Sequence, residues 1–292
     1  MKVWDDLLEK VLRYAESDVR VRIAALEGSR TNPNITPDRY QDLDVVFFVE
    51  DLESFKQDDG WLNVFGERLM MQKPEDMELF PPDLENGVFS YLMLFKDETK
   101  LDLNLVPLAE TEAYIADSDG LFRILLDKDG RAGQLELPPS TDRAYWIKQP
   151  TARMVEDCCN EFWLTSTYAA KGLARHEFLY AVDHLHGIMR PNLLRMMAWR
   201  VGAEHGFTFS LGKNYKFLPR YLPADTWAAL QSTYAGGGEQ EVWRSLFMCM
   251  TLFREAAAAV AEQLGCGLPD YAEGVASYIE TLYRRTVQEA SR

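Results

Sequence analysis

The 292-residue chain contains few cysteines, and this scarcity limits the kinds of site that it could hold. There are four, Cys158, Cys159, Cys249 and Cys266, and they do not have the spacing of a metal-ligand motif. A disulfide framework or a structural zinc site is therefore not expected. Free thiols are typical of a reducing compartment, so we expect a cytoplasmic protein.

The chain also lacks any hydrophobic stretch long enough to cross a bilayer. Its first residues, MKVWDDLLEKVLRYAE, are too acidic for a secretory signal, and their apolar members recur at helical spacing. We therefore expect no membrane partner for this chain.

Basic residues are in deficit, with 31 Lys and Arg against 46 Asp and Glu and a net charge of −15. A field of that sign repels phosphate backbones, so nucleic acid is not expected as a partner. The same field attracts a polycationic small molecule, although acidity can also serve solubility alone. The hydrophobic share of 47% is too high for a disordered chain. We expect a folded monomer or weak dimer.

The residues that are present predict an α+β fold in two domains, divided at Gln149-Pro150. Residues 1–149 are expected to form a mixed β-sheet with flanking helices, and residues 150–292 an α-helical bundle. Strands are predicted at 21–26, 44–49, 88–96, 100–106 and 122–126, with 88–96 and 100–106 as an antiparallel hairpin. Helices are predicted at 3–16, 108–117, 154–171, 176–189, 192–204, 224–234, 240–263 and 269–284.

Three acidic residues stand at the predicted strands. Side chains two apart on a strand share a face, so Asp42 and Asp44 project together. Alternation in Leu-Asp-Leu-Asn-Leu puts Asp102 on the polar face of its strand. Converging carboxylates repel one another unless a cation joins them, and Mg²⁺ prefers carboxylate and phosphate oxygens. We therefore expect Mg²⁺ to bind here.

A turn suited to phosphate precedes these acids. Gly28 lets the backbone approach a ligand, and amides at such a turn can hold phosphate oxygens. Ser29 adds a hydroxyl donor and Arg30 a charged one. Alternatively, Gly28-Ser29 is only a turn and Asp42 only ends a loop. The combination of the turn with same-face acids and a third acid favours a site.

This order of parts resembles the nucleotidyltransferase superfamily of DNA polymerase β. Longer segments resemble the aminoglycoside 6-adenylyltransferase family, which modifies streptomycin. These segments are EGSRTNPN, QDLDVVFFV, LDLNLVP, NEFW, STYAAKGLARHE, DHLHGIMRPNLLRMMAWRVG and GKNYKFLPRYLP. The resemblance implies Mg²⁺-dependent transfer of AMP from ATP to a hydroxyl of an aminoglycoside, with release of pyrophosphate and resistance to the antibiotic.

The same resemblance implies that Asp42 and Asp44 bind the metal ion. Asp102 either binds metal as well or takes the proton from the attacking hydroxyl. One departure from the superfamily pattern is the long spacer between Ser29 and Asp42.

The second domain is expected to supply the cations that a triphosphate needs, because few basic residues lie near the motif. Lys213 and Lys216 in GKNYK are the first candidates, and Tyr215 could stack on or bond to the nucleotide. Arg195 and Lys171 follow. The alternative for all four basic residues is that they are surface charges.

A cationic acceptor calls for acidic and aromatic side chains, and Glu85, Glu161, Trp163 and Asp183 are the candidates. Trp163 stands at helical spacing and could belong to the core instead. Two other functions stay open: a related nucleotidyltransferase with another polyol or a protein as acceptor, and a nucleotide-binding sensor without transfer activity. The presence of all three carboxylates disfavours the sensor.

Overall fold

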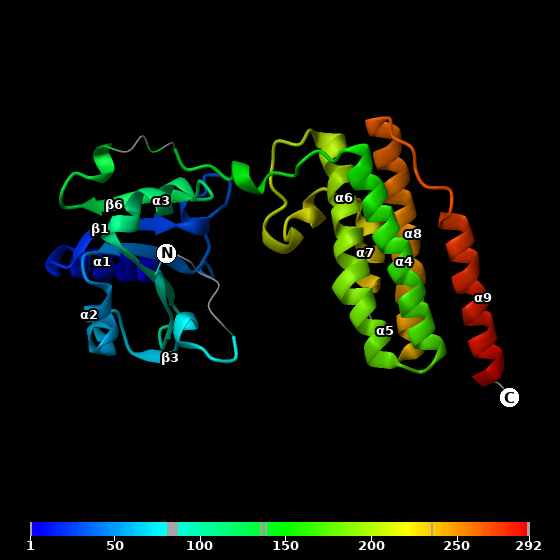
Figure 1. Ribbon diagram of the computed structural model, residues 1–292, viewed down its shortest axis with the longest axis horizontal. Helices are drawn as coiled ribbons and strands as arrows, with labels where there is room; N and C mark the ends of the chain where they lie inside the picture. Colours follow the sequence, from blue (N-terminus) through cyan, green and yellow to red (C-terminus); the bar gives the residue numbers. More distant parts are fainter. Residues whose placement is uncertain (1, 81–86, 135–136, 138, 235, 291–292) are drawn as a thin grey trace. The chain divides into compact units, whose positions relative to one another are not determined.

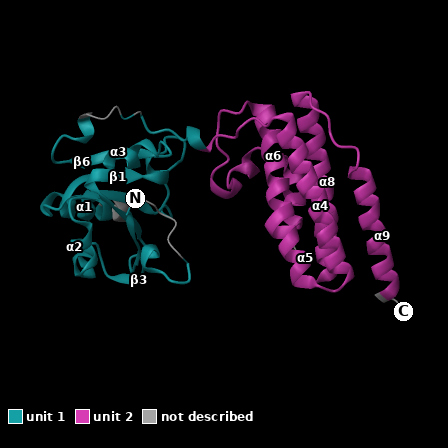
Figure 2. Ribbon diagram, viewed as in Figure 1, with its two compact units in different colours: residues 1–144 teal, residues 145–292 magenta. Residues whose placement is uncertain are grey.

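The structure is a computed structural model that describes residues 2–80, 87–134, 137, 139–234 and 236–290. It divides between Ala144 and Tyr145 into two compact units, residues 1–144 and 145–292 (Figure 2). The division lies five residues before the one that the sequence indicated. The α+β class, with a mixed sheet in the first unit and helices in the second, is confirmed. Within the described ranges, no helix is long and apolar enough to cross a membrane.

The N-terminal unit is built on a six-stranded sheet in the order β3-β4-β5-β2-β1-β6. Strands β2 and β5 pair in parallel and the other neighbours are antiparallel. The strands are β1 (Val21–Glu27), β2 (Leu43–Val49), β3 (Arg68–Gln72), β4 (Phe89–Phe95), β5 (Lys100–Pro107) and β6 (Phe122–Asp127). The predicted hairpin is β4 with β5. Strand β3 was not predicted, because it is a short edge strand without an alternating pattern.

Helices cover both faces of this sheet (Figure 1). Helix α1 (Lys2–Ser17) buries Leu7, Val11 and Ala15, which recur every four residues, against one face. Tyr114 and Ile115 of α3 (Thr111–Ala116) pack on the other. The remaining pieces are α2 (Leu52–Lys56) and the 3₁₀ turns Gly28–Thr31, Asp59–Val64, Pro74–Asp76, Leu108–Glu110 and Ala132–Gln134. A further 3₁₀ turn, Arg143–Tyr145, spans the division between the units.

The C-terminal unit is a helical bundle in which α4, α6 and α8 lie side by side (Figure 1). Its core contains the stacked rings of Phe162 and Phe253, with centroids 3.8 Å apart. The helices are α4 (Ala152–Ala174), α5 (Phe178–His184), α6 (Arg190–His205), α7 (Ala224–Ser232), α8 (Glu239–Leu264) and α9 (Ala272–Ala290), and the 3₁₀ turns are Lys213–Tyr215 and Leu218–Arg220.

The helices predicted at 176–189 and 192–204 are not separate, and Pro191 does not interrupt the helical path. A π-helical turn, Leu185–Met189, joins α5 directly to α6, so the helical path runs through the proline. Proline lacks an N–H and its ring crowds the carbonyl four residues earlier, here that of Gly187. The wider π turn contains Gly187 and accommodates both defects.

Candidate active site

The sheet brings the three predicted acids to one place. Strands β2 and β5 are parallel neighbours, and their register pairs Asp44 with Asp102. Asp42 directly precedes β2, and its charge acts on Asp44. The arrangement follows from alternation within each strand and from the pairing of β2 with β5.

A lysine that the sequence analysis did not single out lies between two of the acids. The Nζ of Lys100 is 2.7 Å from Oδ2 of Asp42 and 2.7 Å from Oδ2 of Asp102. Burial opposes the charged form, but hydrogen bonds to Asp102 and Asp42 outweigh it and raise the pKa of Lys100. The signal was available, because Lys100 stands two residues before Asp102 and so shares its face of β5.

Burial raises the pKa of three carboxyl groups at this place. Burial, followed by the charges of Asp102 and Asp42, raises the pKa of Asp44 to about 6. Burial also raises the pKa of Asp102, in spite of its ion pair with Lys100. Burial raises the pKa of Glu27, the last residue of β1, to about 7, and the hydroxyl of Tyr114 donates to its Oε2 at 3.1 Å. Glu27 is a fourth acid that the sequence analysis missed, directly before the Gly-Ser turn.

The side-chain oxygens of Asp42, Asp44 and Asp102 are suitable ligands for a hard divalent cation. All are carboxylate oxygens, and Oδ1 of Asp102 is buried without a hydrogen-bond partner among the described residues. In the described part of the chain, no three His, Cys, Asp or Glu side chains are already arranged around a metal position. The ammonium group of Lys100 pairs with Asp42 and Asp102 at this place.

Gly28 allows the turn to approach Asp44. Its φ of +65° lies in the left-handed region, and a Cβ added there would meet Oδ2 of Asp44 at 2.6 Å. The hydroxyl of Ser29 accepts a hydrogen bond from Nε2 of Gln41 at 3.2 Å. The expectation that this turn offers free amides needs one correction: the N–H of Gly28 donates to the carbonyl of Leu121 at 3.0 Å.

Arg30 supports the loop that carries Asp42. Its Nε donates to the backbone carbonyl of Asp42 at 2.9 Å, and its charge lowers the pKa of Asp44 slightly against the larger effect of burial. The structure therefore gives Arg30 a role in positioning an acid. A contact between Arg30 and nucleotide stays a prediction.

Replacing Gly28 with Ala is expected to cost more stability than replacing Gly130, a matched control. Both glycines have φ near +65°, at +65° and +67°, but a Cβ at Gly130 would meet nothing within 4 Å. Both variants carry the backbone penalty of about 1–3 kcal/mol, and Gly28→Ala adds overpacking of similar size. Urea denaturation measures the free energy of unfolding. Equal losses in the two variants would contradict the close contact with Asp44.

The GKNYK segment of the C-terminal unit has a strained backbone. Asn214 and Tyr215 have φ values of +55° and +59°, which non-glycine residues rarely adopt. Such strain costs about 1–3 kcal/mol per residue and is concentrated at functional sites. Lys213 and Lys216 of the same segment are exposed.

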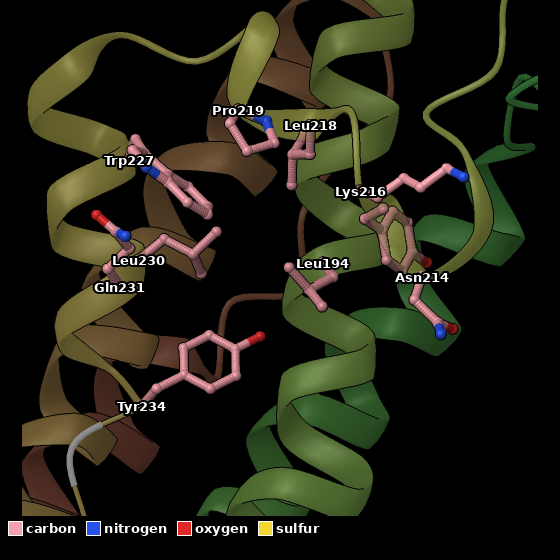
Figure 3. Close-up of a pocket in the computed structure, with 10 residues that line it drawn as sticks. Leu194, Asn214, Lys216, Leu218, Pro219, Trp227, Leu230, Gln231 and Tyr234 are labelled. Carbon is pink, nitrogen blue, oxygen red and sulfur yellow. The ribbon is translucent and has the colours of Figure 1, made fainter. Parts of the chain in front are cut away.

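Tyr215 and Lys216 line a cavity of about 410 Å³ (Figure 3). Trp227 and Tyr234 lie across the cavity from Lys216. The lining residues include one cation and no carboxylate, and they are Leu194, Asn214, Tyr215, Lys216, Leu218, Pro219, Trp227, Leu230, Gln231 and Tyr234. An aromatic ring with an anionic substituent suits such walls better than a polycation does.

Of the two further basic candidates, only Arg195 lies near this segment. Its charge acts on the hydroxyl of Tyr215, whose pKa is raised chiefly by burial. Lys171 is near the C-terminal end of α4, and its Nζ lies 6.0 Å from the ring of Tyr278. Cys158, which contacts Asn192 near Arg195, precedes Lys171 by thirteen residues, or about 20 Å of helix. The structure does not bring Lys171 together with the other basic candidates.

The residues proposed to contact the acceptor differ in exposure. Trp163 is 3% exposed and packs edge-on against Phe162 and Phe253, so it belongs to the core and is not available as a wall. Glu161 of α4 and Asp183 of α5 are exposed. Glu85 lies outside the described residues. The helical spacing of Trp163 had already indicated the core as the alternative.

Comparison with known proteins gives matches over nearly the whole chain. Residues 1–282 match the family described as streptomycin adenylyltransferase. An aminoglycoside 6-adenylyltransferase of Bacillus subtilis (strain 168) is 55% identical over 283 residues, which are 97% of this chain and 99% of that protein. One of Campylobacter jejuni is 50% identical over 279 residues, 96% and 95% of the two chains. A crystal structure of an aminoglycoside 6-adenyltransferase from Bacillus subtilis is 50% identical, with coverage of 95% and 97% and a TM-score of 0.47.

Proposed function

The chain belongs to the streptomycin adenylyltransferase family and is a nucleotidyltransferase, and from this premise we propose its reaction in full. It transfers the adenylyl group of ATP to a hydroxyl of an aminoglycoside such as streptomycin, releases pyrophosphate, requires Mg²⁺ and confers resistance to the antibiotic. The observation that carries the proposal is the register of Asp44 with Asp102, beside Asp42 and the turn at Gly28.

The residues of the N-terminal unit have distinct tasks in this reaction. Asp42 and Asp44 would hold Mg²⁺, with Asp102 as a further ligand or as the proton acceptor. When bound, the cation supplies charge neutralisation on the phosphate oxygens. The acceptor oxygen forms a bond to the α-phosphorus as the bond to the pyrophosphate oxygen breaks, and the hydroxyl proton passes to a base. Ser29 and the turn at Gly28 contact the phosphates.

The C-terminal unit contributes to nucleotide binding through the GKNYK segment. The cavity beside Tyr215 and Lys216 has aromatic walls and one cation, which suits a nucleotide. Its lack of carboxylates makes it a poor place for a polycationic aminoglycoside. Exposed Glu161 and Asp183, together with the net charge of −15, support a cationic acceptor elsewhere on the enzyme.

The proposal is tested by incubating the enzyme with ATP, Mg²⁺ and a panel of acceptors. The panel contains streptomycin, other aminoglycosides and neutral polyols, and pyrophosphate release is measured with the mass of the product. A mass increase corresponding to AMP on an aminoglycoside is expected. The proposal fails if no aminoglycoside is modified, or if a neutral polyol is modified equally well.

Replacing Lys213 and Lys216 together with Ala is expected to raise the KM for ATP at least about tenfold, since hydrogen bonds to charged groups contribute about 1.5–3 kcal/mol each. The KM for the acceptor should not change. Lys171→Ala is the control, because Lys171 lies apart from this segment. Steady-state kinetics with each substrate varied in turn checks this. A larger effect on ATP from Lys171→Ala would contradict the assignment.

A further inference from the structure

Among the described residues, only one lysine, Lys100, has its Nζ within hydrogen-bond distance of two of the proposed catalytic acids. Its ammonium group donates to Oδ2 of Asp42, directly before β2, and to Oδ2 of Asp102, the third residue of β5. The side chain is 35% exposed, so the ammonium is enclosed on the protein side but open to solvent. Lys100 thus neutralises part of the charge that the converging acids create.

A divalent cation bound to Asp42 and Asp102 would neutralise their charge, so the ion pairs with Lys100 would no longer be needed. Carboxylate oxygens that contact a metal ion cannot also hold an ammonium group in the same place without placing two cations a few Å apart. Lysine has a long, flexible stem and a compact charge, so it can leave one partner for another without movement of the backbone. The strand position of Lys100 keeps the ammonium within a side chain's length of the acids.

We propose that Lys100 is an exchangeable counter-ion: it holds Asp42 and Asp102 in the metal-free enzyme and transfers to the phosphates when the metal–nucleotide complex binds. This inference rests on the proposed function and adds a nucleotide-binding residue to it. Lys100 competes with the bare metal ion for the two acids and assists the polyanionic nucleotide. The two effects have opposite signs, and this distinguishes the role from a structural one.

The test measures Mn²⁺ binding to the full-length protein, by the loss of the free-ion electron paramagnetic resonance signal, with and without ATP. Lys100→Met should bind Mn²⁺ alone about 2- to 30-fold more tightly than the wild type, the range contributed by two partly exposed ion pairs. It should bind Mn²⁺·ATP about tenfold more weakly, because a charged contact to phosphate is lost.

Two further variants separate charge from fold. Lys100→Arg keeps the charge and should resemble the wild type toward Mn²⁺ alone. Lys96 lies in the same hairpin but pairs with Glu67, away from the three acids. Lys96→Met should therefore leave the affinities for Mn²⁺ and for Mn²⁺·ATP unchanged. Weaker binding of both Mn²⁺ and Mn²⁺·ATP by Lys100→Met would mark a structural role and overturn the proposal, as would unchanged affinities.

The outcome for the wild type keeps the two proposals apart. A wild-type enzyme that binds Mn²⁺·ATP and adenylylates an aminoglycoside, beside a Lys100→Met variant with unchanged affinities, refutes only the exchange at Lys100. A wild-type enzyme that neither binds Mn²⁺·ATP nor transfers AMP refutes the proposed function, and the inference with it.

Discussion

Replacing Asp44 with Asn is expected to lower the rate of adenylyl transfer at least about 10³-fold. Asp44 is paired in register with Asp102, and its Oδ2 approaches the turn at Gly28. Asparagine keeps the shape and removes the charge that a metal ion requires. Metal ions contribute several kcal/mol to transition-state stabilisation, and roughly 4 kcal/mol corresponds to about a 10³-fold change. Turnover measured from pyrophosphate release checks the result.

The same substitution should not destabilise the metal-free protein at pH 7, and this is the internal control. Burial raises the pKa of Asp44 to about 6, above the ordinary value of 3.8. The folded protein therefore binds this proton more tightly than the unfolded one, and stability falls as pH rises from about 4 to about 6. Asn has no proton to lose and escapes this penalty of up to about 3 kcal/mol. Wild-type turnover in a folded Asp44→Asn variant would refute the assignment.

Asp102→Asn is expected to lower kcat by about 10²–10⁴-fold, the usual contribution of general-base assistance. If Asp102 takes the proton, kcat falls while Mn²⁺ and ATP bind with unchanged affinity, and the acidic limb of the pH–rate profile disappears. If Asp102 binds metal, the affinity for Mn²⁺·ATP falls together with kcat. Kinetics and metal titration on the same variant separate the two roles.

Glu98→Gln is the matched control for Asp102→Asn. Glu98 lies at the tip of the β4–β5 hairpin with its side chain 87% exposed, and it contacts Arg39 at 3.9 Å. Its replacement should leave kcat and metal binding unchanged. Near-wild-type turnover of Asp102→Asn would remove Asp102 from the chemistry.

The sequence predicted most of the sheet because its central strands carry strong patterns. Asp44–Val49 is apolar on both faces, as a central strand must be, and alternation around Asp102 indicated its polar face. Strand β3 escaped prediction because Leu69 and Met70 are exposed at the sheet edge, where burial imposes no pattern. The convergence of the acids could be expected only conditionally, since nothing local specifies that β2 pairs with β5.

The remaining differences concern tertiary contacts. Lys171 and Arg195 are both basic residues in predicted helices, and the sequence does not distinguish them. In the structure Arg195 acts on Tyr215 of the GKNYK segment, whereas Lys171 lies near Tyr278. Trp163 could have faced solvent or the core, and its packing against Phe253 of α8 decides the matter. Lys100 was within reach of strand alternation alone. Its contact with Asp42, however, depends on the residue directly before another strand, β2.

The parallel pairing of β2 with β5 has a consequence for how the enzyme is made. Asp44 and Asp102 are 58 residues apart in the chain (102 − 44), and the intervening segment contains β3 and β4. Pairings of such long separation form slowly, because the entropy of closing the loop is lost before the contacts form. The backbone bonds of the helices and the β4–β5 hairpin join residues that are close in the chain, so these elements can form sooner. During synthesis and refolding, the acids therefore meet only after much of the secondary structure exists, and secondary structure should return before enzymatic competence.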